Sequence, residues 1–185
     1  MKKLLTIALL ATSLAVSASA ATIIGFEAGY LTDSKEMLYS ARVGLELKAD
    51  TALSHQLEIE VGYSQQSESM SLLGGTQTAK FKITPLTLNY RAEFIGGHKL
   101  GYYLGGGIGM CRSSIGFAGS GVPWISDSDS SLALQAFTGI NYKVSPTTTL
   151  QLGLKYLWIG EATLVGITDD VGDDLAIMAG VSFKF

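Results

Sequence analysis

Charged side chains recur at every second position in several otherwise apolar segments of this 185-residue chain. Glu58 and Glu60 form one such pair, and Arg91 and Glu93 form another. Alternate residues of an extended strand point to the same side, so these charges share one face. Charges of both signs on one face can form salt bridges or line a passage for ions. The charges expected to form this interior network are Glu27, Arg42, Glu46, Glu60, Lys82, Arg91 and Lys155.

A salt-bridged plug is favoured over an ion passage. If the strands close into an eight-stranded barrel, the interior is only wide enough for side chains to fill it. Charges held there must pair or keep water, because breaking a buried pair costs roughly 3 to 5 kcal/mol. A charged gate that rearranges to pass small ions is the alternative.

Catalytic, cofactor and metal chemistry is not expected. A catalytic histidine activates a neighbouring nucleophile, but His55 and His98 both fall at short turns and neither begins a His-x-Ser pattern. The acidic stretches 127–129 and 169–174 could offer carboxylates to calcium, yet they lack EF-hand spacing and are expected to be solvated. The run 105–109 is rich in glycine but lacks the lysine that completes a nucleotide-binding loop.

Eight segments with a period of two must position the charged residues. The third is the clearest, with Leu57, Ile59, Val61 and Tyr63 facing one way. An even number of antiparallel strands returns both termini to one side, as single-chain bacterial barrels require. We therefore expect an all-β fold, an eight-stranded antiparallel transmembrane β-barrel with up-and-down topology. The segments are 23–30, 39–48, 56–64, 80–94, 100–111, 132–142, 150–158 and 175–185.

The fourth segment predicts an irregularity. Phe81 and Ile83 share a face, but the apolar set after Pro85 begins at Leu86 and is shifted by one position. Because proline cannot donate to the strand ladder, we expect a β-bulge at Thr84 and Pro85. This bulge would keep Lys82 on the inner face.

The connections alternate in length. Short turns are predicted at 49–54, 95–99 and 143–148, and long loops at 31–38, 65–78, 112–131 and 160–173. Transmembrane barrels have short periplasmic turns and longer extracellular loops. The loop 112–131 carries Phe117 and Trp124, the first candidates for contact with a surface partner, since exposed aromatic residues often anchor interfaces. They could instead pack across the barrel mouth.

The amino terminus predicts export. Lys2 and Lys3, an apolar run from Leu4 to Val16 and a small-residue site before Ala21 form a signal peptide, cleaved after residue 20. Residues 21–185 then form one domain. Lysine and arginine are scattered, so no basic stripe exists for nucleic acid to follow. The single Cys111 cannot form an internal disulfide and is expected to be a packed small residue.

Alternation alone does not distinguish a membrane barrel from a soluble lipocalin-like carrier with its apolar face inward. Aromatic residues near the strand ends, such as Tyr30 and Trp158, and a glycine- and serine-rich opposite face favour lipid outside. Glycine on a water-facing surface would weaken strands without benefit. The membrane barrel is therefore preferred, and the soluble carrier is retained as an alternative.

Three stretches resemble known outer-membrane proteins. Phe185, Phe183 and the alternating residues before them resemble the carboxy-terminal signature that the barrel-assembly machinery recognises. The stretch 85–91, and the stretch 139–142 followed by 152–157, resemble the small outer membrane protein beta-barrel families related to the OmpA transmembrane domain. The resemblance implies a barrel in the bacterial outer membrane without a fixed function.

We expect a structural or surface-interaction role in the cell envelope, with a lumen plugged by polar and charged side chains. The alternatives are a narrow porin-like pore and the soluble carrier. Expected partners are outer-membrane lipid, lipopolysaccharide, the barrel-assembly machinery and a surface partner met through the long loops. The protein is not expected to be an enzyme.

Overall fold

The computed structural model describes residues 21–49, 53–72, 75–94, 99–119, 122–165 and 167–185. The predicted signal peptide, residues 1–20, and His98 lie outside these ranges. Within them, no helix is long and apolar enough to cross a membrane. The strands are β1 (Thr22–Leu31), β2 (Met37–Ala49), β3 (Leu53–Leu72), β4 (Gly75–Phe94), β5 (Leu100–Gly119), β6 (Val122–Lys143), β7 (Thr148–Leu164) and β8 (Ile167–Lys184).

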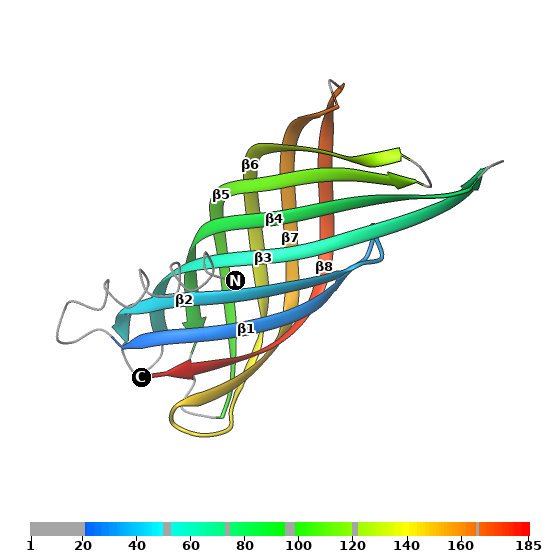
Figure 1. Ribbon diagram of the computed structural model, residues 1–185. Coiled ribbons are helices and arrows are strands. Elements are labelled where there is room, and N and C mark those ends of the chain that lie inside the picture. Colours follow the sequence, from blue (N-terminus) through cyan, green and yellow to red (C-terminus); the bar gives the residue numbers. More distant parts are fainter. Residues whose placement is uncertain (1–20, 50–52, 73–74, 95–98, 120–121, 166) are drawn as a thin grey trace.

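The strands form a closed antiparallel barrel in sequence order (Figure 1). Strand β8 pairs with β1, so that Phe183 lies opposite Ile24. The backbone of Phe185 continues this closure, because its N–H donates to the carbonyl oxygen of Thr22 at 2.9 Å. The predicted all-β, eight-stranded, up-and-down barrel is confirmed. A role of Phe183 and Phe185 in recognition by the assembly machinery stays a prediction.

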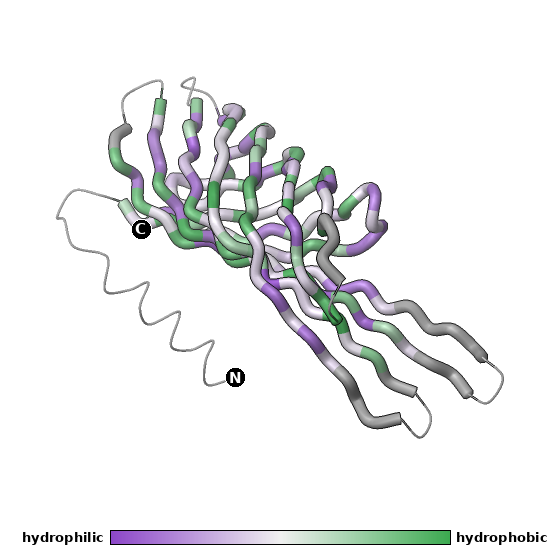
Figure 2. Tube along the Cα trace, turned by 90° about the horizontal axis from the view of Figure 1, so that it is seen from above, coloured by the Kyte–Doolittle hydropathy of each residue, from purple (hydrophilic) through white to green (hydrophobic). Residues whose placement is uncertain are grey.

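Hydrophobic and hydrophilic residues alternate along the strands (Figure 2), and the exposed set is apolar while the buried set is largely polar. On β4, Leu86 and Leu88 are 52% and 48% exposed, whereas Thr87 and Asn89 between them are buried. Apolar side chains that all point outward need a non-aqueous surrounding. The lipocalin-like alternative is wrong, because a soluble barrel would turn this face inward.

Three of the four predicted long loops, 65–78, 112–131 and 160–173, are mostly strand, so that part of the prediction is wrong, whereas most of 31–38 lies between β1 and β2 as a turn. Strands β3 to β6 contain 20 to 22 residues each, about twice the 9–11 residues that cross a bilayer. The hairpins β3–β4 and β5–β6 therefore extend well beyond the closed part of the barrel (Figure 1). The outward-facing positions of these extensions, such as Lys82, Ser114 and Ser128, are polar, so their sequence resembles that of a loop. Phe117 thus lies in β5, opposite Ile125 of β6, and Trp124 also lies in β6.

The predicted bulge at Thr84 and Pro85 is also wrong. Val61 pairs with Leu86 and Ser64 with Ile83, so the register between β3 and β4 is unchanged across the proline. Proline removes one donor but still occupies one residue of strand, so the ladder loses a bond without gaining a residue. Lys80 and Lys82 consequently lie on the outer face with Leu86, while Phe81 and Ile83 turn inward.

Glycine residues of β5 make room inside the barrel. A Cβ at Gly107 would lie 1.8 Å from Oδ1 of Asn89, and one at Gly105 would lie 2.4 Å from the ring of Phe137. Large inner side chains of β4 and β6 therefore occupy the space beside β5, which has no side chain at positions 105, 107 and 109. This packing lets a narrow barrel hold long polar side chains at its centre.

Gly109→Ala tests this packing. A Cβ at Gly109 would lie 1.9 Å from the carbonyl oxygen of Leu86, which is backbone and cannot rotate away. We expect Gly109→Ala to lower the free energy of unfolding by about 1–3 kcal/mol, measured by urea titration of the protein folded in lipid vesicles. Gly106→Ala on the outer face of the same strand is the matched control and should change it little. Equal effects would contradict the packing argument.

Candidate functional site

Six charged side chains meet inside the barrel. They occupy inward-facing positions on five of the strands. They are balanced, with three carboxylates facing three cations, and each is at most 7% exposed. Burying an ion without a partner is very costly, so this balance is what permits them to stay in the lumen. The members are Glu27 of β1, Arg42 of β2, Glu58 and Glu60 of β3, Arg91 of β4 and Lys155 of β7.

Glu27 is the hub of this lumen network. Its carboxylate forms an ion pair with Arg42 and accepts a hydrogen bond from Nζ of Lys155 at 3.0 Å. Nη2 of Arg91 lies 3.6 Å from the same carboxylate. One acidic side chain on the first strand thus contacts cations from β2, β4 and β7 across the lumen.

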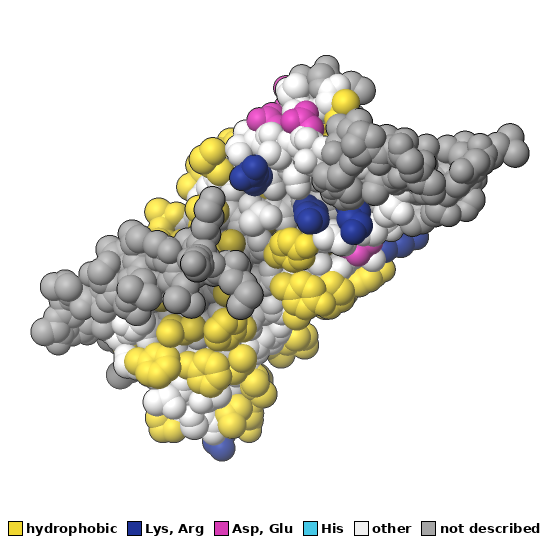
Figure 3. All heavy atoms as spheres, viewed as in Figure 1, with side chains coloured by type: hydrophobic (Ala, Val, Ile, Leu, Met, Phe, Trp, Pro, Cys, Tyr) yellow, Lys and Arg dark blue, Asp and Glu magenta, His cyan; other side chains and the backbone are white. Residues whose placement is uncertain are grey.

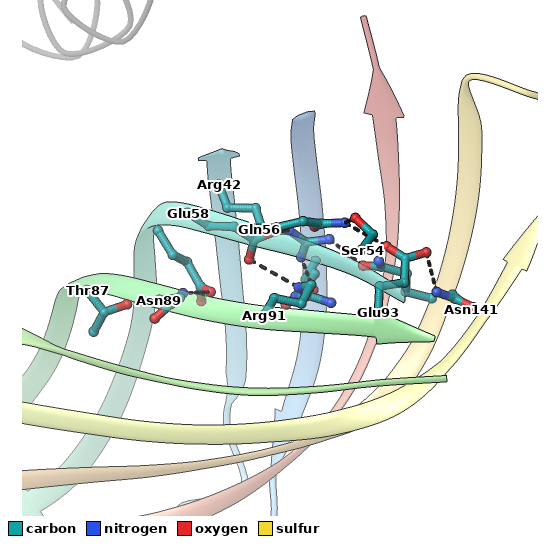
Figure 4. Close-up of polar contacts among 12 residues, drawn as sticks. Arg42, Ser54, Gln56, Glu58, Thr87, Asn89, Arg91, Glu93 and Asn141 are labelled. Carbon is teal, nitrogen blue, oxygen red and sulfur yellow. Dashed lines mark hydrogen bonds and ion pairs between the residues drawn. The ribbon is translucent and has the colours of Figure 1, made fainter. Parts of the chain in front are cut away.

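Glu58 and Glu60 complete the network on β3. The Nε atoms of Arg42 and Arg91 each lie 3.2 Å from an oxygen of Glu58. The close-up shows these side chains among the polar residues of the interior (Figure 4). Glu60 pairs with Lys155 and accepts from the amide of Asn89 at 3.0 Å. Each carboxylate is therefore held by cations or amides from other strands.

Neutral polar side chains fill the remaining space. Gln135 donates to Oδ1 of Asn89 at 2.7 Å and to the hydroxyl of Thr87 at 3.0 Å. Nearer the end where the termini lie, Gln56 donates to Glu93 at 2.8 Å, and Asn141 donates to the other oxygen of Glu93 (Figure 4). These amides extend the polar filling beyond the charged centre.

The guanidinium of Arg91 contacts the faces of two aromatic rings. Its Cζ is 4.3 Å from the ring centroid of Tyr103 and 4.8 Å from that of Phe137. Such cation–π contacts favour a desolvated cation. Phe137 was not among the residues expected in the lumen, because an apolar residue among inward polar ones departs from the alternation. The glycine at 105 on the facing strand was the signal for it.

Two residues expected in the network lie elsewhere. Glu46 is at the rim near the termini, where it pairs with Lys184 at 2.6 Å and accepts from Ser54 at 2.6 Å. Lys82 is on the outer face, because the bulge that would have turned it inward is not formed. Glu58, absent from the principal set of expected residues, is in contact with both arginines.

Above the polar filling, the lumen becomes apolar toward the long hairpins. Leu31, Leu38, Ala176 and Met178 form one buried cluster. The second cluster is Cys111, Ala133, Leu157 and Ile159, with Ile83 and Val171 packed against it. The expectation that Cys111 is a packed small residue is confirmed. A cavity of about 280 Å³ opens above these clusters at the mouth, with Asp33 and Asp174 in its lining.

The other candidate residues have local structural partners. His55 lies on the outer face and its Nδ1 shares a hydrogen bond with the hydroxyl of Tyr90. Asp127 and Asp129 accept the backbone N–H groups of Val165 and Thr163, each at 2.7 Å, which connects β6 to the end of β7 and to the residue after it. Among the residues with described side chains, no group of three or more His, Cys, Asp or Glu could hold a metal ion.

The family model for the outer membrane protein beta-barrel domain matches residues 6–185. The chain belongs to this family. The protein is accordingly a β-barrel of the bacterial outer membrane, as its outward apolar face requires. No curated protein matches the sequence.

Solved outer-membrane barrels share the fold. A major outer membrane protein from Thermus thermophilus has a TM-score of 0.71 at 15% identity, covering 90% of this chain and 100% of its own. Neisserial surface protein A has a TM-score of 0.62 at 17% identity, covering 90% and 96%. The attachment invasion locus protein Ail of Yersinia pestis, in complex with the heparin analogue sucrose octasulfate, has a TM-score of 0.55 at 16% identity, covering 90% and 97%.

Lys155→Met tests the balance of the lumen network. The substitution leaves Glu27 and Glu60 buried with one cation fewer, so we expect the free energy of unfolding to fall by roughly 3 to 5 kcal/mol. Lys184→Met is the matched control, because its side chain is 46% exposed and pairs with Glu46 at the rim. That change should cost at most about 1 kcal/mol. Urea titration followed by heat-modifiable gel migration measures both, and similar losses would contradict the burial argument.

Proposed function

We propose that this outer-membrane barrel is a closed anchor that presents its long hairpins at the cell surface for interaction with a partner. The observation that carries the proposal is the balanced lumen network, in which cations and carboxylates from five strands meet across the interior. A passage at this level requires at least one of those ion pairs to break. That cost opposes ion flow, and a barrel without a channel serves the envelope through its exposed parts.

The extended hairpins support the surface role. Strands β3 to β6 continue beyond the apolar band, and Phe117 in β5 is 43% exposed. Rigid strands present side chains with less conformational freedom than a loop of the same length, which lowers the entropy cost of binding. Neisserial surface protein A and the attachment invasion locus protein Ail, which share the fold, bear names that place them at surfaces or in attachment.

Planar-bilayer recording tests the closed lumen. We expect the wild-type protein to give no discrete conductance steps. The double variant Glu58→Ser/Arg91→Ser removes an ion pair at constant net charge and opens space, so it should produce steps. Wild-type steps that change in size after Arg42→Gln or Arg91→Gln would instead establish a pore and overturn the closed anchor.

Shortened hairpins test the surface role. A variant in which residues 68–79 and 115–127 are each replaced by an Asn-Gly turn joins residues that are already paired, Ser67 with Lys80 and Ser114 with Ser128, and keeps the membrane-crossing part of every strand. We expect cells with this variant to lose adherence to a cultured epithelial monolayer while their resistance to detergent stays unchanged. Heat-modifiable migration confirms that the variant is folded. Unchanged adherence together with detergent sensitivity would indicate a purely structural role.

A further inference from the structure

The outer face of three neighbouring strands carries a cluster of cations and hydroxyl groups. In register across β4, β5 and β6, Lys82 pairs with Ser114 and Ser114 with Ser128. In the next row, Thr84 pairs with Arg112 and Arg112 with Ser130. Lys80 follows on the same face of β4. We call Lys80, Lys82, Thr84, Arg112, Ser114 and Ser128 the outer basic cluster.

This cluster begins where the apolar band ends. The next row of outward-facing residues, on the side toward the termini, is Leu86, Met110 and Leu132. They are paired in register and are 52%, 60% and 48% exposed. Two residues of strand separate the rows, a rise of about 7 Å. Lys and Arg side chains are gathered beyond the edge of the hydrophobic band on the face shown in Figure 3. The cluster therefore lies at the depth of lipid headgroups, on the side of the long hairpins.

The cluster forms a depression with a net positive charge. A cavity of about 470 Å³ is lined by both lysines, Arg112 and the hydroxyl residues. Nη2 of Arg112 donates to the hydroxyl of Ser128 at 3.0 Å, which orients the guanidinium along the sheet. Asp127 also lines the cavity, but its two oxygens accept the backbone N–H groups of Ser128 and Val165 at 2.8 and 2.7 Å. Among the described residues of this lining, the cations exceed the carboxylate by two charges.

An apolar groove on the outer face adjoins the cluster. It has a volume of about 1080 Å³, and small residues such as Ala28, Ala41 and Ala179 form its floor. Thr84 belongs to the lining of both the groove and the basic cavity. A soluble anion would use the cations alone, whereas an anionic lipid would place its headgroup on the cations and an acyl chain along the groove.

We propose that the outer basic cluster binds a phosphate group on the headgroup of an outer-leaflet lipid of the lipid A class. Guanidinium and ammonium groups donate charge-assisted hydrogen bonds to phosphate oxygens, and the hydroxyl groups add neutral donors. The ligand is recognised at the rim of the apolar band, so the site fixes the height of the barrel in the leaflet. This site is separate from the lumen network and goes beyond the proposed anchor function.

The test uses the full mature barrel folded in zwitterionic detergent micelles. Native mass spectrometry measures binding of diphosphoryl lipid A to the wild type and to Lys80→Gln/Lys82→Gln/Arg112→Gln. At about 1 kcal/mol for each cation at an anionic surface, we expect the triple variant to bind roughly 100-fold more weakly. The matched control, Lys35→Gln/Lys99→Gln/Lys143→Gln, removes the same charge elsewhere and should bind as the wild type does.

Two further titrations identify the source of the phosphate. Lipid A without phosphate groups should bind wild type and triple variant equally and weakly. Inorganic phosphate, at the phosphate concentration of the lipid, should not compete. Equal affinity of the wild type and the triple variant for diphosphoryl lipid A would overturn the site. Competition by inorganic phosphate, or tight binding of the phosphate-free lipid, would overturn the assignment to a lipid phosphate.

Discussion

The structure depends on one constraint: backbone N–H and C=O groups must form hydrogen bonds with each other where no water is available. A sheet in hydrocarbon meets this constraint only when its edges pair, and here β8 pairs with β1. Closure of an eight-stranded sheet leaves a lumen that side chains must fill. The period of two then determines the chemistry of both surfaces, with apolar residues toward lipid and polar residues inside. The buried ions follow from this geometry, and their balance of charge follows from their burial.

Most of the architecture could be predicted from the sequence, because alternation in a strand is a local property. Glu27, Arg42 and Lys155 were predicted to face inward from the alternation alone, and in the structure Arg42 and Lys155 both contact Glu27. Lys82 was wrongly predicted to face inward, because the apolar residues shift by one position after Pro85 and this shift resembled a bulge. The shift has another cause. Beyond the membrane the outer face of the sheet becomes polar, and the inner face at the mouth of the barrel becomes apolar. Long-range partners such as Phe137 over Arg91 could not be predicted, since their contact depends on closure of the barrel.

The two ends of the barrel differ in their chemistry. At the end with the termini, the lumen is polar and the outer face carries exposed leucines and tyrosines. Toward the hairpins, Leu157 and Ile159 lie inside, while Lys80 and Lys82 lie outside. The apolar face of the sheet therefore changes from the outside of the barrel to the inside along its length, near the level of Pro85. One protein surface can in this way meet hydrocarbon, headgroups and water in succession without a change of fold.

The lumen network also has a consequence for the order of assembly. Lys155 on β7 is 128 residues from Glu27 and 95 residues from Glu60 in sequence, and it contacts both. A partly assembled sheet that lacks β7 holds an excess of negative charge on its inner surface and retains water there. Docking of the final hairpin supplies the missing cation and completes the edge pairing in the same event. Neutralisation of the interior and closure of the sheet therefore both depend on the same hairpin, β7–β8.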